Sequence, residues 1–321
     1  MKVSQLPTVL SLLFCYTPAV LGGLYQRVDN YVGNAFYDAF EFQAIEDPTH
    51  GRVNYVDQAT AQAQNLTYAS YDSFVLRADS KTVLDPNGPG RNSVRIRSKK
   101  VYTTHVAVFD VRHMPQGCGT WPAIWETNEA VWPNGGEIDI VEGVNDQSPN
   151  AVTLHTGANC TMPPSRNMTG TATYDDCDVA ANYNAGCGVK LPSAQSYGPS
   201  FNANGGGWYA VERNNGFIQA WFWPRNDPYV PFDVRIGAPA VNTYLWGKPS
   251  AFFPNNAGCN LKSHFNENNI IINLTFCGDW AGNSDVYAAS GCPSTCVDFV
   301  NNNPAAFGGA YFDLASVRVY Q

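Results

Sequence analysis

Charged residues are scarce in this chain, and no long apolar run follows its first twenty residues. Only 14% of the 321 residues are Asp, Glu, Lys or Arg, whereas about 25% is usual. The formal net charge is -8, so no excess of positive charge attracts a nucleic-acid backbone or an anionic membrane. The composition therefore predicts neither nucleic-acid binding nor membrane association. At 44% apolar residues, it predicts a globular chain with ample core material.

The N-terminal segment has the three parts of a secretory signal. Lys2 precedes an apolar run, Leu6–Val20, and small glycines follow that run. About 15 mostly apolar residues are too few to span a bilayer, which takes roughly 20. We therefore expect residues 1–22 to be a signal peptide and the protein to be secreted.

Cysteine usage agrees with an oxidising compartment. Of the nine cysteines, Cys15 lies in the N-terminal segment, and the other eight form an even set suited to disulfides. Eight cysteines allow roughly a hundred pairings, among which the sequence does not choose. Cys292 and Cys296 have a zinc-ligand spacing, but no second pair at ligand spacing lies nearby. We predict disulfides, no catalytic metal and no cofactor, and leave a structural calcium ion open. N-glycosylation sequons begin at Asn65, Asn159, Asn167 and Asn273.

Short runs rich in β-branched and aromatic residues recur along the chain and predict a mostly β-protein. The clearest predicted strands are residues 93–98, 105–111, 208–213, 217–223, 270–276 and 312–320. Residues 214–216 (Asn-Asn-Gly) tolerate the positive φ of a hairpin turn. A single short helix is predicted at residues 294–301, opened by Ser294 or Thr295. Because no repeat or linker divides the chain, we expect one all-β domain, a sandwich of two antiparallel sheets.

Three carboxylates interrupt a strand-like run of Ile and Val that glycines bound on each side. Strand alternation places Glu137 and Asp139 on one face but sends Glu142 towards the core, where an unpaired charge is costly. A β-bulge around Ile140–Val141 would return Glu142 to the face of the other two, and bulges are common beside active sites. A solvated polar strand face is the simpler alternative, but it leaves the framing glycines and tryptophans unexplained.

Paired carboxyl groups of unlike pKa are the groups that perform glycoside hydrolysis. In a straight strand the α-carbons of residues 137 and 142 would stand about 16 Å apart. A retaining pair needs its carboxyl groups about 5 Å apart, so the spacing predicts both a bulge and a curved sheet. We expect the sugar chain to lie across the concave side of that sheet.

The pattern Glu137-x-Asp139-x-x-Glu142 resembles the active-site strand of glycoside hydrolase family 16, in its bulged, laminarinase-like form. The likeness extends to residues 47–51, 92–96, 121–125, 277–280 and 317–320. Together these segments resemble secreted fungal endo-β-1,3(4)-glucanases. The resemblance implies a concave, concanavalin A-like β-jelly roll over residues 23–321 and retaining chemistry. It implies that Glu137 is the nucleophile, Glu142 the general acid/base and Asp139 their assistant.

Sugar-binding residues follow from the same resemblance. Trp125, Trp132 and Trp280 lie in segments that bind the substrate in the family, so we expect them to stack on sugar rings. Trp121 is a weaker candidate, and a core or rim position is the alternative for each tryptophan. Arg95 falls on the same strand face and could donate to sugar hydroxyls, unless it is simply a solvated arginine.

His155 is the one histidine that the pattern brings near the carboxylates. If residues 137–143 and 151–156 form a hairpin in which Gly143 faces Ala151, His155 falls opposite Asp139. It could then tune Glu142 or hold a sugar hydroxyl. An ordinary polar strand residue is an equal alternative on spacing alone.

The sequence thus predicts a secreted, monomeric, retaining endo-β-glucanase whose partner is β-1,3- or mixed β-1,3/1,4-glucan. A cell-wall transglycosylase using the same glycosyl-enzyme intermediate is the first alternative. A non-catalytic β-glucan-binding lectin is the second, because jelly rolls also host sugar-binding proteins. The linkage preference stays open.

Overall fold

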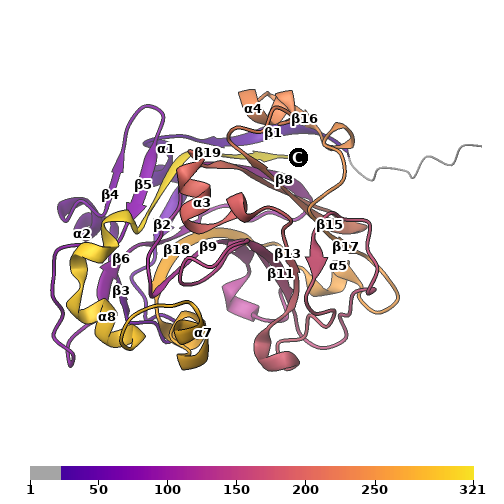
Figure 1. Cartoon of the computed structure of the whole chain (residues 1–321). Helices are drawn as coiled ribbons and strands as arrows, with labels where there is room; N and C mark the ends of the chain where they lie inside the picture. The colour runs from indigo at the N-terminus through magenta and orange to yellow at the C-terminus, as the bar shows by residue number, and fades with distance from the viewer. Residues whose placement is uncertain (1–22) are drawn as a thin grey trace, which may run out of the picture.

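The computed structural model describes residues 23–321, and two large antiparallel sheets make up most of that part (Figure 1). The predicted signal peptide, residues 1–22, lies outside the described residues. No helix within residues 23–321 is both long enough and apolar enough to cross a membrane.

We name the two sheets by their content. The acidic sheet carries the three carboxylates, and its strands lie in the order β12 (Thr171–Ala172), β13 (Cys187–Lys190), β11 (Ala151–His155), β10 (Glu137–Glu142), β9 (Thr120–Thr127), β18 (Asn269–Phe276), β7 (Arg95–Ser98) and β2 (Phe40–Phe42). The partner sheet has the order β16 (Ala240–Asn242), β1 (Leu24–Tyr31), β19 (Tyr311–Tyr320), β8 (His105–His113), β14 (Gly207–Arg213), β15 (Phe217–Pro224) and β17 (Ala251–Pro254). The strands β5 (Phe74–Arg77) and β4 (Thr67–Ala69) extend it beside β19, and β3 (Val53–Tyr55) pairs separately with β6 (Arg91–Ser93). The predicted all-β sandwich is confirmed.

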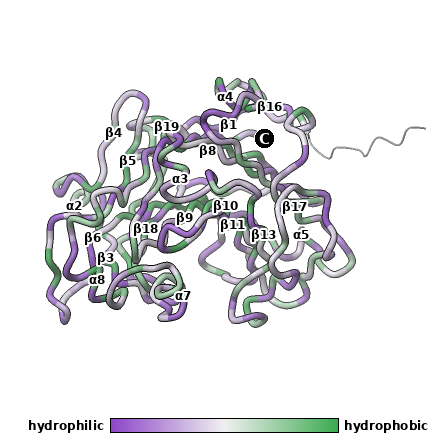
Figure 2. The backbone as a smooth tube through the Cα atoms, in the orientation of Figure 1, coloured by the Kyte–Doolittle hydropathy of each residue, from purple (hydrophilic) through white to green (hydrophobic). Residues whose placement is uncertain are grey.

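The main core lies between the sheets. Alternate residues of facing strands fill it, among them Ile138 from β10 and Val211 from β14, both fully buried. Hydrophobic residues follow the strands, while the surrounding loops are mixed or hydrophilic (Figure 2). Burial on this scale is the main stabilising term of such a sandwich.

The predicted strands are confirmed, with two differences of detail. Residues 93–98 fall into two strands, β6 and β7, because Val94 leaves the ladder between them. The β14–β15 hairpin forms as predicted, with Arg213 opposite Ile218. Its turn has no positive φ, and the Asn214 side-chain oxygen accepts hydrogen bonds from the N–H groups of Gly216 and Phe217 at 2.8 and 3.1 Å.

The predicted helix is α8 (Cys296–Asn302), and Thr295 caps it by accepting from the N–H of Asp298. Further short helices were not predicted, because each has too few residues to show a helical period. They are α1 (Ala35–Ala39), α2 (Gln58–Ala63), α3 (Gly198–Ala203), α4 (Phe232–Ile236), α5 (Leu261–His264), α6 (Gly278–Ala281) and α7 (Ser284–Ala289).

All eight cysteines of the described chain form disulfides, as predicted. The pairs are Cys118–Cys292, Cys160–Cys259, Cys177–Cys187 and Cys277–Cys296. Cys292 and Cys296 therefore do not form a zinc pair. Among the sequons, Asn273 is unsuited to glycosylation, because it is 6% exposed and its side chain bonds to Trp125 and Tyr55.

Candidate active site

The predicted bulge is present in β10. Asp139 faces Trp125 of β9, and Val141 faces Ile124, so Ile140 is the extra residue. Because of this insertion, Ile138, Ile140 and Val141 are all buried, while Glu137 and Glu142 are both partly exposed. The bulge thus resolves the conflict between strand alternation and a charge at position 142.

Asn150 holds the bulge together. Its side-chain oxygen accepts the N–H of Glu142 at 2.9 Å, and its side-chain nitrogen donates to the carbonyl of Ile140 at 2.9 Å. The side chain is fully buried, so these bonds replace the ladder bonds that a bulge leaves unmade. Sequence reasoning missed this residue, since an Asn among Asp, Ser and Pro is typical of a solvent-exposed turn.

The framing glycines are required by close packing. Gly136 has a φ of +74°, and a Cβ there would come within 2.4 Å of the Phe265 ring. At Gly143 a Cβ would meet the ring of Tyr197 at 2.6 Å. Both ends of β10 therefore pass so close to aromatic rings that only glycine fits.

Two tryptophans donate hydrogen bonds to the outer carboxylates. The indole N–H of Trp132 donates to Glu137 at 2.8 Å, and that of Trp121 donates to Glu142 at 2.9 Å. Trp132 therefore has a second possible role beside stacking. Trp121, the weaker sequence candidate, directly contacts a carboxylate. Trp280 packs edge-to-face on Trp121, with ring centroids 5.6 Å apart.

Burial is the largest influence on all three carboxyl groups. It raises the pKa of Glu137 to about 7, although the Trp132 hydrogen bond and the Arg95 charge oppose the shift. It also raises the pKa of Glu142 to about 7, opposed by Trp121 and His155 and assisted by the charge of Glu137. Burial, together with the charges of both glutamates, raises the pKa of Asp139 well above its usual range. The site can therefore hold protons near neutral pH.

His155 lies beside the carboxylates, but in a different register from the predicted one. It faces Glu137, and Asp139 faces Thr153, so the predicted pairing with Asp139 is wrong by two residues. The loop between the strands is longer than the hairpin argument assumed. The Nε2 atom of His155 is nevertheless 3.4 Å from the Asp139 carboxylate, because the two residues lie diagonally across the ladder. Burial lowers the pKa of His155, so its imidazole is neutral at neutral pH.

Arg95 lies beneath the site rather than on its surface. Its side chain is 3% exposed, forms an ion pair with Glu129 at 2.6 Å, and donates to Gln43 at 2.9 Å. Its guanidinium carbon is 5.0 Å from the centroid of the Trp125 ring. Direct donation from Arg95 to sugar hydroxyls stays a prediction. In the structure Arg95 packs on Trp125, whose indole N–H donates to Asn273 at 2.8 Å.

Within residues 23–321, two groups of side chains have the proximity of metal ligands. In the first, ligand atoms of Glu137, Asp139 and His155 lie within 4.8 Å of one another. These three side chains belong to the candidate catalytic group itself.

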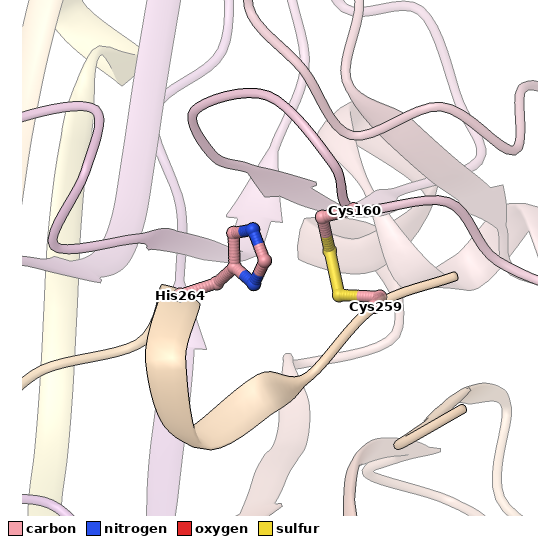
Figure 3. Close-up of side chains that lie close together, drawn as sticks. All are labelled: Cys160, Cys259 and His264. Carbon is pink, nitrogen blue, oxygen red and sulfur yellow. A yellow bond between two sulfur atoms is a disulfide. The ribbon is translucent and has the colours of Figure 1, made fainter. Parts of the chain in front are cut away.

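The second group is His264 beside the Cys160–Cys259 disulfide (Figure 3). The sulfurs of Cys160 and Cys259 are bonded to each other, so neither can provide a thiolate ligand. The His264 ring nitrogens face the carbonyls of Asn260 and Ala158 at 2.9 and 3.0 Å. This group therefore has a structural role, linking α5 to the loop that contains Cys160.

Residues 40–320 match the family of XgeA-like catalytic GH16 domains. A probable glycosidase of Schizosaccharomyces pombe is 44% identical over 95% of this chain and 71% of its own length. A probable endo-1,3(4)-β-glucanase of Aspergillus clavatus is 42% identical over 92% of this chain. The chain spans only 46% of that relative's length.

Solved structures agree in fold. GH16 laminarinase 16A from Phanerochaete chrysosporium, with β-glucans in its donor and acceptor sites, is 68% identical, with a TM-score of 0.92. The match covers 93% of this chain and all of that one. An elongating GH16 β-1,3-glucosyltransferase is 36% identical, with a TM-score of 0.85, over 92% of this chain and all of that one. The expected β-jelly roll is thereby confirmed, and the chain belongs to glycoside hydrolase family 16.

Proposed function

We propose that this protein is a retaining endo-β-glucanase that hydrolyses β-1,3- or mixed β-1,3/1,4-glucan. The observation that carries the proposal is the bulge at Ile140, because it sets Glu137, Asp139 and Glu142 on one strand face. Each glutamate accepts an indole N–H, so tryptophan rings surround the reacting groups. Aromatic rings beside paired carboxyl groups suit a neutral sugar polymer.

The first step uses the two glutamates in different protonation states. The Glu137 carboxylate attacks the anomeric carbon, while Glu142 gives its proton to the oxygen of the leaving sugar. The glycosidic C–O bond breaks, and an ester bond to Glu137 forms. In the second step Glu142 takes a proton from water, whose oxygen displaces Glu137 and releases the second product.

The surroundings favour this division of roles. Arg95 carries a permanent positive charge that stabilises the ionised form of Glu137. For Glu142, by contrast, the nearby charge of Glu137 raises the pKa. When the pair holds one proton, that proton is therefore favoured on Glu142, as an acid catalyst requires.

Glucosyl transfer is the second candidate, and one observation favours it. The 36% identical relative with the same fold is a β-1,3-glucosyltransferase. A transferase uses the same first step and then lets a sugar hydroxyl, instead of water, attack the ester to Glu137. We propose hydrolysis as the main reaction, since the 68% identical relative is a laminarinase.

The test is digestion of laminarin, lichenan, xyloglucan and chitin side by side, with products analysed by mass spectrometry. We expect shortened oligosaccharides from laminarin and lichenan only. Products longer than a defined oligosaccharide substrate, formed in excess of shorter ones, would instead identify a transglycosylase. Binding to laminarin without any cleavage would contradict both reactions and favour a lectin.

Secretion and a monomeric state complete the proposal. Four disulfides in residues 23–321 suit an extracellular protein. Mass spectrometry of the protein recovered from culture medium should find a mature N-terminus near residue 23. Light scattering should give the mass of one chain.

A further inference from the structure

The imidazole of His155 has a close neighbour at each of its two ring nitrogens. Nδ1 lies 3.0 Å from the side-chain oxygen of Asn184. Nε2 lies 3.4 Å from the Oδ2 atom of Asp139. The side chains of His155 and Asp139 are 10% and 2% exposed, so both are largely removed from solvent. The positions of the protons on this pair therefore depend on the neighbours that the structure provides.

The loop that carries Asn184 is held firmly against the ring. It runs between Cys177 and Cys187, whose disulfide is fully buried. Residues 182–184 have φ angles of 49°, 57° and 60°, a left-handed conformation that persists only where the surrounding structure holds it. A Cβ at Gly186 would come within 2.8 Å of the imidazole Cε1, so the backbone of the loop also contacts the ring.

The contacts of the ring determine which nitrogen carries the proton. A neutral imidazole has one N–H and one acceptor nitrogen, and the Asn184 side-chain oxygen only accepts, so the N–H of His155 is at Nδ1. Nε2 is then an acceptor. The Asp139 Oδ2 atom that it faces is buried and has no other hydrogen-bond partner within residues 23–321. Two acceptors avoid repulsion only when a proton lies between them, so Asp139 must be the donor.

The charges around Asp139 agree with a neutral carboxyl group. On its own strand, Glu137 and Glu142 lie on the same face, and across the ladder Asp139 faces Trp125 and Thr153, which carry no charge. The imidazole is close to the same two glutamates. Burial and the charges of both glutamates raise the pKa of Asp139. Nothing in this arrangement stabilises a third negative charge.

We propose that Asn184 is a positioning residue that holds His155 in the Nδ1–H tautomer and thereby keeps Asp139 protonated between the two glutamates. A neutral Asp139 adds no second negative charge beside Glu137, so Glu137 can ionise and attack while Glu142 keeps its proton. This inference rests on the proposed glucanase activity. It adds a residue from outside the acidic sheet that contacts no reacting atom and acts through His155.

The experiment compares Asn184→Gly and Asn184→Asp with the control Asn182→Gly. Glycine removes the side chain without straining a left-handed backbone. Asn182 has the same backbone conformation in the same loop, but it is not the residue that contacts His155. Aspartate keeps an oxygen acceptor and cannot donate.

The first measurement is the tautomer of His155. Two-bond proton–nitrogen NMR spectra are recorded at alkaline pH on protein with isotope-labelled histidine, and the His155 signal is identified by its loss in His155→Gln. We expect the proton on Nδ1 in the parent protein, in Asn184→Asp and in Asn182→Gly. In Asn184→Gly the acceptor is gone, so the proton should move to Nε2, where it can donate to an ionised Asp139.

The second measurement is the pH profile of kcat/KM on laminarin. An ionised Asp139 raises the pKa of Glu137, which must be ionised to attack. The acid limb of Asn184→Gly should therefore move about one unit to higher pH, which is about a tenfold loss of kcat/KM on that limb. Asn182→Gly should keep the profile of the parent protein. A merely structural loss would lower activity without moving the limb.

Three results would overturn the inference. One is a proton on Nε2 in the parent protein, and another is an unchanged tautomer in Asn184→Gly. The third is a changed tautomer with an unmoved acid limb, which would mean that the tautomer does not control Asp139. A parent protein with the Nδ1–H tautomer but no activity on laminarin would instead refute the proposed function, because the tautomer is measured without turnover.

Discussion

The eight tryptophans divide evenly between the two sheets, and their surroundings differ. On the outer face of the partner sheet, Trp208, Trp221, Trp223 and Trp246 are 3–7% exposed and belong to one apolar cluster. Residues of the segment that includes α4 complete this cluster and cover the sheet. On the acidic sheet and its flanking loops, Trp121, Trp125, Trp132 and Trp280 are all partly or largely exposed.

The difference lies in what each indole N–H contacts. In the acidic sheet, Trp121 and Trp132 donate to catalytic candidates, while Trp246 on the other sheet donates to Asp233, which also accepts the N–H of Asn242. The residue type is the same in both regions. What separates them is that residues 225–250 cover the tryptophans of the partner sheet, whereas the tryptophans of the acidic sheet stay partly or largely exposed. Exposure of the strand face, set by distant chain segments, therefore decides the role of a tryptophan.

The largest expected effect comes from replacing Glu137 of the acidic sheet, compared with replacing an acid of the partner sheet. Glu137→Gln should lower kcat on laminarin at least about a thousandfold, because no ester intermediate can form. The control is Glu212→Gln in β14, because Glu212 is a fully buried acid of the partner sheet that accepts a hydrogen bond from Tyr25 at 2.9 Å. It should keep kcat within about twofold.

Circular dichroism must show that both variants are folded, and the Glu137→Gln preparation must be free of deamidation. Substantial turnover by such a preparation would remove Glu137 from its assigned role. A comparable loss in Glu212→Gln would mean that the two sheets do not differ in the way described.

A smaller effect is expected when the bulge loses its side-chain support. Asn150→Ala leaves the N–H of Glu142 and the carbonyl of Ile140 unpaired, so Glu142 should shift and kcat should fall about tenfold to a hundredfold. Asn214→Ala is the matched change, since it removes the turn bonds of the regular β14–β15 hairpin. It should lower the melting temperature with little change in kcat. If Asn150→Ala kept full kcat, the bulge would not depend on this side chain.

The smallest effect separates the hydrogen bond of Trp132 to Glu137 from the sugar stacking that we propose for its ring. In Trp132→Phe the ring is kept, but the hydrogen bond that favours ionised Glu137 is lost. The pKa of Glu137 should therefore rise, and the acid limb of the kcat/KM profile should move to higher pH. Trp132→Ala should show the same shift and a further loss of roughly threefold to tenfold on long glucans. An unmoved acid limb in both variants would leave stacking as the only role of Trp132.

The sequence predicted most of the fold because its strands are long, alternating and separated by clear turns. It also located β10 and the bulge, since a buried charge at Glu142 is physically costly. Local reasoning failed where the answer depended on distant partners. The register of His155 depends on a loop whose Asn150 turns inward, and the burial of Arg95 depends on Glu129 and Gln43.

The origin of the raised pKa values was likewise only partly predictable. A sequence shows which charges neighbour Glu142 along the strand, but burial is the larger cause of its raised pKa. Burial of a residue on a sheet face is produced by loops from other parts of the chain. The loop with Asn184, which contacts His155, is one whose backbone conformation no sequence pattern predicts.

The central claim is that the bulge at Ile140 brings Glu137 and Glu142 close enough for direct attack by Glu137. Carboxyl groups about 5 Å apart leave no room for an attacking water, so the configuration at the anomeric carbon must be retained. Proton NMR of a fresh laminarin digest tests this directly. We predict that the β-anomer of the new reducing end appears first and the α-anomer only later, by mutarotation. An initial α-anomer would mean that the carboxyl groups stand roughly 6.5–9.5 Å apart and that Glu137 does not attack directly.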